Sequence, residues 1–458
     1  MTITACRLYF LRVRTRVPYK FGTETFTEAV CARVCLSVRD SHGREAEGWG
    51  ETPLNVGWVW PSQLPYSLRE EALSDFCRSI AVQWMCSQAQ GHPLEIGYAF
   101  LQSDLPDLWN KRNASVQEED RMPWLAALVC ASPFDLALYD AFGKLVGCPV
   151  YEVLDREWLP RDLSVFLEPA PDSRVSFKDR YPADYLAPAV SKLPVWHSVG
   201  SLDPLDAGEV REDPHDGYPV LLEDWIVRDG LFCLKVKLRG NEADWDYHRL
   251  AKIGAIGRRH GVRWLCADYN CTAESVEYVT DMLDRLRVDD PLTYAMLLYV
   301  EQPFAYELEE HSLDVHAIAA RKPLFMDESA HDWKVISLGR QLGWNNVALK
   351  TCKTQTEALL SLCWARAHGM TLMVQDLTNP MLAFITHASL AAHAGTIMGL
   401  ECNAPQYYPQ ASEFEARIHP DLFARRNGYI DLRSIKGPGF GYRIEEIGRP
   451  LPPEEELV

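Results

Sequence analysis

The sequence predicts an α/β protein built around a (β/α)8 barrel, and three observations lead to this prediction. From residue 193 onward, short apolar and β-branched runs alternate with helical stretches of about 10 to 16 residues, which is typical of repeated βα units. Eight such runs are present, and eight strands separated by helices close naturally into a barrel. Polar residues end most of these runs, where the active face of a barrel lies.

Each expected strand of the barrel is short and is followed by a stretch with helical spacing. The eight strands are expected to begin at Pro194, Leu231, Val262, Met296, Pro323, Asn346, Thr371 and Gly395.

The first 155 residues follow a different pattern, which predicts an α+β capping domain. The first 60 residues contain strand-like runs and a turn at Ser41-His42-Gly43, as in β-hairpins. Residues 67–90 and 123–145 have helical periodicity, with an apolar stripe that includes Phe134, Leu138 and Phe142.

Four segments are therefore expected along the chain. Residues 1–155 form the capping domain, 156–192 an irregular insertion with five prolines, and 193–402 a modified barrel of the TIM type. Residues 403–458 are expected to pack back on the capping domain and complete it.

Composition excludes some classes of partner. The 46 basic and 64 acidic residues give a net charge of -18, and no basic cluster is present, so we expect no nucleic-acid partner. We see neither a signal peptide nor an apolar run of about 20 residues, so we expect no membrane partner and a cytoplasmic location. The thirteen cysteines are scattered singly, as reduced buried thiols are.

Charged residues at the ends of consecutive strands predict a metal site. Asp268, Glu301 and Asp327 end the third, fourth and fifth expected strands. Three carboxylates from neighbouring strands can converge on one hard cation, and oxygen ligands without His or Cys favour Mg²⁺ over zinc, with Mn²⁺ as the alternative. Such a cation would stabilise the enolate formed when the proton next to a substrate carboxylate leaves.

Lysines at two strand ends predict the acid and the base. Lys235 and Lys237 end the second strand and share one of its faces, so beside a bound cation they should lower each other's pKa. We expect Lys237 to be the base and Lys235 its electrostatic partner. Lys350 ends the sixth strand, across the barrel, and would approach the opposite face of the substrate carbon.

This ordered set of residues resembles the enolase superfamily, and within it the muconate-lactonizing subgroup of the mandelate racemase/muconate lactonizing enzyme family. The motifs are LKVK, the Asp of ADYN, the Glu of VEQPF, MDES and the Lys of VALK, together with GWGETP and the helix from Ser132 in the capping domain. The resemblance implies the same metal ligands and the same lysine roles. It also implies a homo-oligomer and a small-molecule carboxylate substrate.

Further residues are expected to contact substrate. Asn270, Asp376 and Glu401 stand at or just beyond strand ends, and Asn270 is expected to share a strand face with Asp268. Tyr19 and Trp58 lie where the family places the loops that close over substrate. Structural roles in salt bridges or in packing of the small domain remain alternatives for them. Three departures from the family pattern bear on the substrate: Lys353-Thr354-Gln355 replaces a lysine followed by a glycine pair, the segment before the barrel is enlarged, and strand eight ends in ECNAPQYYP.

Two reaction types and one non-catalytic role are open at this point. Lysines on both faces of the carbon favour racemisation or epimerisation through a metal-stabilised enolate. β-Elimination, as in a dehydratase or succinylbenzoate synthase, and cycloisomerisation use the same site, with one lysine stabilising charge. A ligand-binding barrel without turnover is a third reading, although binding alone does not need paired bases.

Overall fold

The computed structural model describes residues 1–21 and 24–457, and it begins with a three-stranded antiparallel sheet. Strands β1 (Thr2–Phe21), β2 (Glu24–Arg39) and β3 (Glu45–Pro53) pair in chain order. The turn between β2 and β3 lies at the expected position, where Gly43 has a φ of 80° and donates its N–H to the carbonyl of Asp40.

Two long helices cover this sheet, as the sequence predicted. They are α2 (Tyr66–Cys86) and α5 (Trp124–Val146), and α5 packs closely on β3. Gly48 and Gly50 allow this approach, because a Cβ atom on Gly48 would lie 2.1 Å from the backbone nitrogen of Ala141. The remaining helices of this region are α1 (Val56–Val59), α3 (Pro93–Ala99), the π-helix η1 (Phe100–Asp104) and α4 (Leu105–Asn113).

The apolar character of α5 corrects one expectation. Within the described residues, the stretch Glu118–Val146 is long and apolar enough, by length and composition, to cross a membrane. Its apolar window is entirely buried inside the protein, because the sheet lies on one side of α5 and other helices lie around it. Its composition is thus that of a central core helix.

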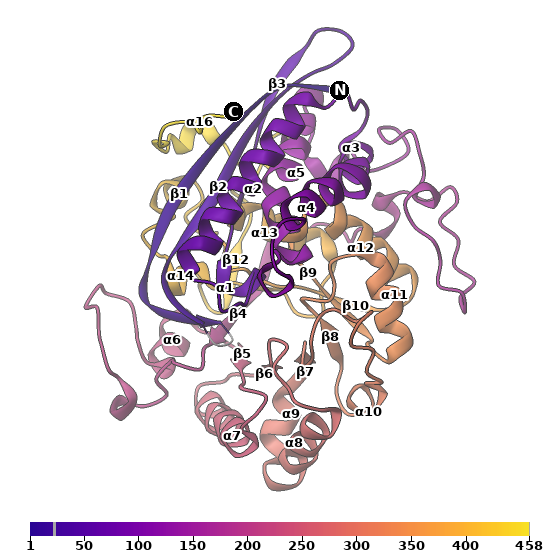
Figure 1. Ribbon diagram of the computed structural model, residues 1–458. Helices are drawn as coiled ribbons and strands as arrows, with labels where there is room; N and C mark the ends of the chain where they lie inside the picture. Colours follow the sequence, from indigo (N-terminus) through magenta and orange to yellow (C-terminus); the bar gives the residue numbers. More distant parts are fainter. Residues whose placement is uncertain (22–23, 458) are drawn as a thin grey trace.

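The second half of the chain forms the closed parallel barrel that the sequence predicted (Figure 1). All eight expected strands are present, and β11 pairs with β4 to close the ring. The strands are β4 (Lys192–Val199), β5 (Cys233–Lys237), β6 (Trp264–Asp268), β7 (Leu297–Glu301), β8 (Leu324–Met326), β9 (Asn346–Leu349), β10 (Thr371–Val374) and β11 (Leu400–Glu401).

Helices alternate with these strands around the outside of the barrel. They are α6 (Leu222–Asp229), α7 (Ala243–Arg259), α8 (Val276–Asp289), α9 (Pro291–Met296), α10 (His316–Ala319), α11 (Trp333–Leu342), α12 (Gln355–Ala367) and α13 (Met381–Ala394).

Residues 156–192 run as an extended loop on the right-hand side of Figure 1, and their regular structure is limited to two short 3-10 turns before β4 begins. Several of their aromatic and aliphatic side chains are buried, among them Leu159, Phe166 and Phe177. The indole of Trp364 on α12 donates to the carbonyl of Glu168. The loop is therefore held to the barrel by packing and by hydrogen bonds.

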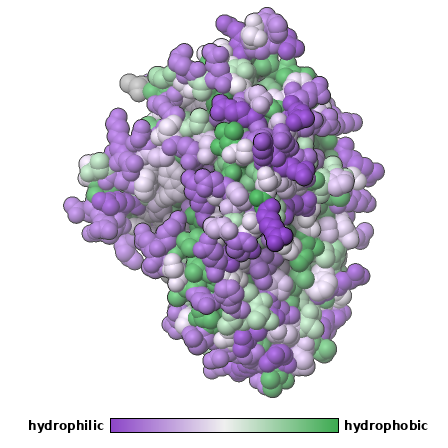
Figure 2. All heavy atoms as spheres, turned by 90° about the vertical axis from the view of Figure 1, so that its right-hand side faces the viewer, coloured by the Kyte–Doolittle hydropathy of each residue, from purple (hydrophilic) through white to green (hydrophobic). Residues whose placement is uncertain are grey.

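The C-terminal segment contacts both the barrel and the capping sheet. Strand β12 (Tyr429–Asp431) pairs antiparallel with β4, and the short helices α14 (Ala404–Tyr407), α15 (Glu413–Ile418) and α16 (Ile444–Ile447) flank it. Near the chain end, the N–H of Glu455 donates to the carbonyl of Leu8 on β1. On the face shown in Figure 2, polar residues dominate and apolar residues are scattered among them, as is ordinary for a protein surface.

Candidate active site

A ring of charged side chains lies directly above an apolar layer inside the barrel. That layer consists of one inward side chain from each of six strands: Trp196, Cys233, Cys266, Tyr299, Phe325 and Met373. Residues two positions apart on a strand share a face, so the next inward positions follow from this layer. They are Lys235, Asp268, Glu301, Asp327 and Gln375, and each of them is buried.

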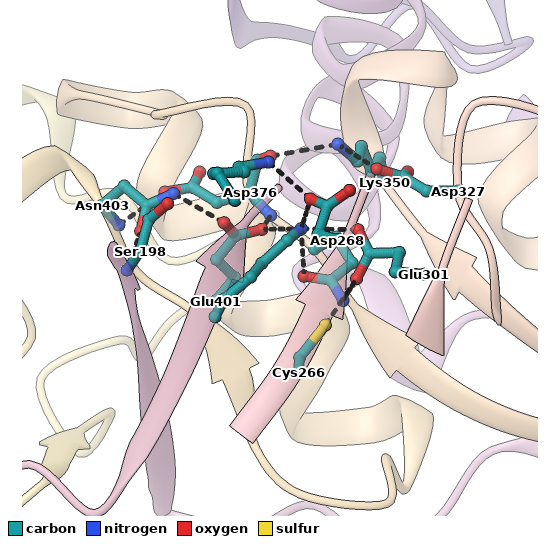
Figure 3. A network of polar contacts seen from close by, with 12 residues as sticks. Ser198, Cys266, Asp268, Glu301, Asp327, Lys350, Asp376, Glu401 and Asn403 are labelled. Carbon is teal, nitrogen blue, oxygen red and sulfur yellow. Dashed lines mark hydrogen bonds and ion pairs between the residues drawn. The ribbon is translucent and has the colours of Figure 1, made fainter. Parts of the chain in front are cut away.

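Lys235 is the shared partner of three carboxylates of the ring, Asp268, Glu301 and Glu401, which are labelled in Figure 3. Its Nζ lies 2.5 Å from Oε1 of Glu301, 3.1 Å from Oδ2 of Asp268 and 3.1 Å from Oε2 of Glu401. It also donates to Oε1 of Gln375, at 3.2 Å. Burial alone would lower the pKa of Lys235, but the three carboxylates around it outweigh that effect and hold its pKa well above its usual value.

The two outer lysines contact different carboxylates. Nζ of Lys237 lies 2.5 Å from Oδ2 of Asp268, and Nζ of Lys350 lies 2.9 Å from Oδ2 of Asp327. Strand β5 and strand β9 are separated by β6, β7 and β8, which carry the three acidic residues. The acidic residues therefore lie between the two lysines around the ring.

Two buried side chains beside Asp327 extend the ring. Lys353 donates to the carbonyl of Asp327 and lies 3.4 Å from its Oδ1. Glu328 accepts hydrogen bonds from Nε1 of Trp58 at 2.8 Å and from Nδ2 of Asn270 at 3.2 Å. Burial, reinforced by the charge of Asp327, raises the pKa of Glu328 above its usual value.

The ends of β10 and β11 close the network on the opposite side. The backbone N–H groups of Asn379 and Asn403 donate to the carboxylate of Asp376, and the carbonyl of Asp376 accepts from Lys350 at 3.1 Å. Glu401 accepts from the side chain of Asn403 at 2.7 Å. Burial, with the charge of Glu401, raises the pKa of Asp376 to about 7.

Two residues of the capping domain cover the ring. The indole of Trp58 lies over Lys350, whose Nζ is 4.3 Å from the ring centroid. The hydroxyl of Tyr19 lies 2.9 Å from the hydroxyl of Thr378, and its ring packs on Tyr407. Both side chains are buried, and Trp58 contacts two members of the ring directly, Lys350 and Glu328.

The family model "Enolase C-terminal domain-like" matches residues 219–447, half of the chain, and includes the whole ring except the capping residues. The chain belongs to the enolase superfamily. Within it, the chain falls in the mandelate racemase/muconate lactonizing enzyme family, which places it among isomerases and lyases. The resemblance inferred from the sequence is confirmed.

Solved structures of this family share the fold at low sequence identity. The N-succinyl Arg/Lys racemase from Bacillus cereus ATCC 14579 is 15% identical, with 99% of each chain covered and a TM-score of 0.62. The muconate lactonizing enzyme from Pseudomonas fluorescens, complexed with muconolactone, is 17% identical, with 96% of each chain covered and a TM-score of 0.58.

The dipeptide epimerase from Cytophaga hutchinsonii, complexed with Mg and D-Ala-L-Val, is 19% identical, with a TM-score of 0.58; 89% of this chain and 88% of that chain are covered. The comparison of this enolase-superfamily member with curated proteins found no match.

The charges of the ring fit a divalent cation. Six buried carboxylates face four buried lysines, so the formal charge of the ring is two negative charges in excess, which one divalent cation would balance. The carboxylates are Asp268, Glu301, Asp327, Glu328, Asp376 and Glu401, and the lysines are Lys235, Lys237, Lys350 and Lys353. Without a cation, burial raises the pKa of Glu301 well above its usual value, although Lys235 opposes this.

The donor types also fit, because carboxylate oxygens are the ligands that Mg²⁺ prefers. Among the described residues, however, no three acidic, His or Cys side chains are grouped as a ready-made metal cage. Lysine ammonium groups lie against Asp268, Glu301 and Asp327 instead. In the protein without a cation, these ammonium groups supply the counter-charge.

The expected lowering of the pKa of Lys235 assumes a cation beside it. The protein groups alone act in the opposite direction, because its neighbours are carboxylates. One expectation about the ring was wrong. Asn270 does not share a strand face with Asp268, because β6 ends at Asp268 and Asn270 has a φ of 44°. Its side chain turns to Glu328, and its backbone N–H donates to Oδ1 of Asp268.

Two members of the ring were missed in the sequence. Gln375 bridges Lys235 and Glu301, with its Nε2 2.6 Å from Oε2 of Glu301. Lys353 contacts Asp327 from the turn after β9. A signal for Gln375 was present, because it lies two residues after the inward Met373, but a neutral amide attracts less notice than a charge.

Proposed function

We propose that the protein is a Mg²⁺-dependent racemase or epimerase that moves the proton next to the carboxylate of a small molecule. The observation that carries this proposal is the arrangement of Lys237 and Lys350 on opposite sides of the three acidic residues, each in contact with one of them. A substrate carbon between the lysines would present one face to each. One lysine can then remove a proton while the other returns one.

The carboxylates of Asp268, Glu301 and Asp327 are the residues that would hold the cation. When bound, it would supply electrophilic stabilisation of the negative charge that develops on the substrate carboxylate. Lys235 contacts two of these residues and holds a positive charge near the same oxygens. Lys237 takes the proton at its Nζ, and Lys237 is the most exposed of the four lysines, with 8% of the residue exposed.

The capping residues have a role that follows from their burial. Trp58 and Tyr19 exclude water from the ring, and exclusion of water strengthens every charge interaction inside it. Trp58 also holds Lys350 through its ring and Glu328 through its indole N–H. A substrate must therefore enter while this cover is displaced.

The test is proton exchange in D₂O with a library of chiral carboxylic acids and Mg²⁺. The wild type should incorporate deuterium next to the carboxylate with inversion of configuration. Lys237→Ala should lose this exchange by a factor of about 10³, because general base catalysis contributes about 10²–10⁴. Lys350→Ala should block inversion and retain exchange at the face served by Lys237.

One observation favours a second candidate, β-elimination or cycloisomerisation. Burial lowers the pKa of Lys350, but Asp327 outweighs this effect and raises it above its usual value. A lysine held as a cation suits the stabilisation of charge as well as proton return. Loss of a leaving group or ring formation without inversion of recovered substrate would select this candidate, and ligand binding without any exchange would contradict both.

A further inference from the structure

A cavity of about 740 Å³ lies beside the barrel mouth and has no role in the proposed reaction. Most of its lining comes from the loop that follows β4, from helices α6 and α7, and from residues 16–18 of β1, and the rest includes Arg239 and Gln406. Its size is within the range of about 300–1,000 Å³ that small-molecule sites occupy.

The walls of the cavity combine apolar side chains with charged ones, among them Asp203, Glu209 and Glu212. Leu202, Pro204 and Val220 come from the loop after β4, and Trp225 and Trp245 come from α6 and α7. Two tryptophans and several aliphatic side chains suit the body of an organic molecule better than an inorganic ion.

The loop that forms one wall is fixed to the capping sheet. Arg16 on β1 pairs with Asp216 at 2.7 Å and 2.9 Å, and it also donates to the carbonyls of Tyr218 and Pro219. The side chain of Arg16 is only 3% exposed. The cavity is therefore bounded by anchored backbone.

Arg249 of α7 is the unusual residue of this cavity. It is 92% buried by accessible surface, with 8% exposed, and it lies 5.5 Å from the centroid of Trp245. Its Nη2 donates to the carbonyls of Gly200 and Asp203, whereas its buried Nε has no acceptor. In the part of the chain that the structure describes, no carboxylate forms an ion pair with this guanidinium.

Two other arginines of the cavity have direct ion pairs: Arg16 pairs with Asp216, and Arg239 pairs with Glu242 at 2.7 Å. Arg211 is exposed to solvent. The carboxylates of Asp203 and Glu209 act on Arg249 only from beyond ion-pair distance, and burial outweighs them and lowers its pKa. A buried guanidinium without a direct ion pair is costly, and an anion bound in the cavity would reduce that cost. Arginine is also well suited to bind carboxylates and related oxyanions.

We propose that this cavity binds an organic anion with an apolar body, with Arg249 as its counter-ion and the two tryptophans as its apolar walls. The cavity adjoins the active site: Arg239 follows Lys237 by two residues, Pro18 precedes Tyr19, and Gln406 donates to the carbonyl of Ser198. The anion is either a separate ligand or the far end of a long substrate. This second source rests on the proposed function.

The experiment compares two fluorescent probes that differ in charge. 1-Anilinonaphthalene-8-sulfonate carries an anionic group, and N-phenyl-1-naphthylamine has the same aromatic body without it. Binding of both is measured by titration with wild-type protein, Arg249→Met and Arg249→Lys. Arg249→Met should weaken binding of the anionic probe by about tenfold or more and leave the neutral probe within about twofold, because only the charge-assisted contact is lost.

Two further variants keep the test decisive if Arg249→Met folds poorly. Leu202→Trp fills the cavity and leaves Arg249 in place, so it should weaken both probes. Arg287→Met removes an exposed arginine of α8, outside this cavity, and should change neither. Equal affinity of the anionic probe for wild type and Arg249→Met, or no effect of Leu202→Trp, overturns the proposal.

A third measurement separates the two sources of the anion. Competitive inhibition of proton exchange by the anionic probe indicates the far end of a substrate, and binding without inhibition indicates a separate ligand. Probe binding does not depend on exchange, so failure of the proposed function leaves the result for the cavity intact.

Discussion

Two buried clusters of charged side chains in this protein differ in how their charges balance. At the junction of the capping sheet and the C-terminal segment, Arg33 pairs with Glu51 at 2.5 Å, and Arg449 pairs with Glu415 at 2.6 Å. Arg33 also lies 3.4 Å from Glu415, which links the two pairs. In this junction cluster, two positive charges meet two negative charges.

The ring in the barrel mouth has no such balance, since six carboxylates face four lysines. Both clusters are shielded from water, so an unmatched charge is costly in either. The junction cluster meets this cost within the chain and links segments far apart in the sequence. In the ring, the cost of the unmatched charge is met only when a ligand binds. Such a charge imbalance distinguishes a binding site from a cluster that only stabilises the fold.

The largest expected effect breaks the balanced cluster. Arg33→Met should lower the free energy of unfolding by about 3–5 kcal/mol, because it leaves a buried carboxylate without its partner. Urea denaturation followed by circular dichroism measures this. The double variant Arg33→Met with Glu51→Met should recover much of the loss, and a double variant no more stable than the single one would contradict the balanced-charge account.

The second effect supplies the missing charge to the ring. Mg²⁺ at about 100 times its dissociation constant should stabilise the wild type by about 2.7 kcal/mol, measured as a rise in melting temperature after removal of metal with EDTA. Asp327→Asn should abolish this rise. Arg33→Met should show the same rise, starting from a lower melting temperature, because the junction cluster is not expected to bind the cation.

A third effect, at Trp58, distinguishes proton return by Lys350 from proton removal by Lys237. Trp58→Leu should slow proton return by Lys350 roughly tenfold, because a cation–π contact contributes about 0.5–2 kcal/mol. Exchange at the face served by Lys237 should change little. Trp58→Phe retains an aromatic ring over Lys350, so its rate of proton return should fall between those of the wild type and Trp58→Leu. Equal slowing at both faces would mean that Trp58 acts only by closing the site.

Much of the ring could be predicted from the sequence because strand geometry fixes it. A side chain two positions after an inward residue faces inward as well, so Lys235, Asp268 and Glu301 follow from the apolar residues that precede them. Parallel strands then bring their carboxyl ends to one edge. All eight strands of the barrel could also be predicted from the sequence.

Side-chain positions beyond the strand ends could not be predicted in this way. Asn270 lies beyond the end of β6, in a left-handed conformation that no strand pattern describes. The contacts of Trp58 with Glu328 and Lys350 join positions 270 and 292 residues apart, and only the packing of the capping domain on the barrel creates them. The pKa of Lys235 likewise depends on Glu401, a residue on the last strand of the barrel and distant in sequence.

The smallest effect concerns Thr354, where this chain departs from the glycine pair of the family pattern. Thr354 has a φ of 76° and a ψ of 150°, a region that favours glycine, yet its hydroxyl accepts from the N–H of Glu357 at the start of α12. Thr354→Ala loses this cap and keeps the strain, so it should be destabilised by about 1 kcal/mol. Thr354→Gly loses the cap but relieves the strain, and it should be more stable than Thr354→Ala by about 1 kcal/mol in urea denaturation. If alanine and glycine proved equal, the strain at this position would be negligible, and the hydroxyl cap alone would account for threonine in place of glycine.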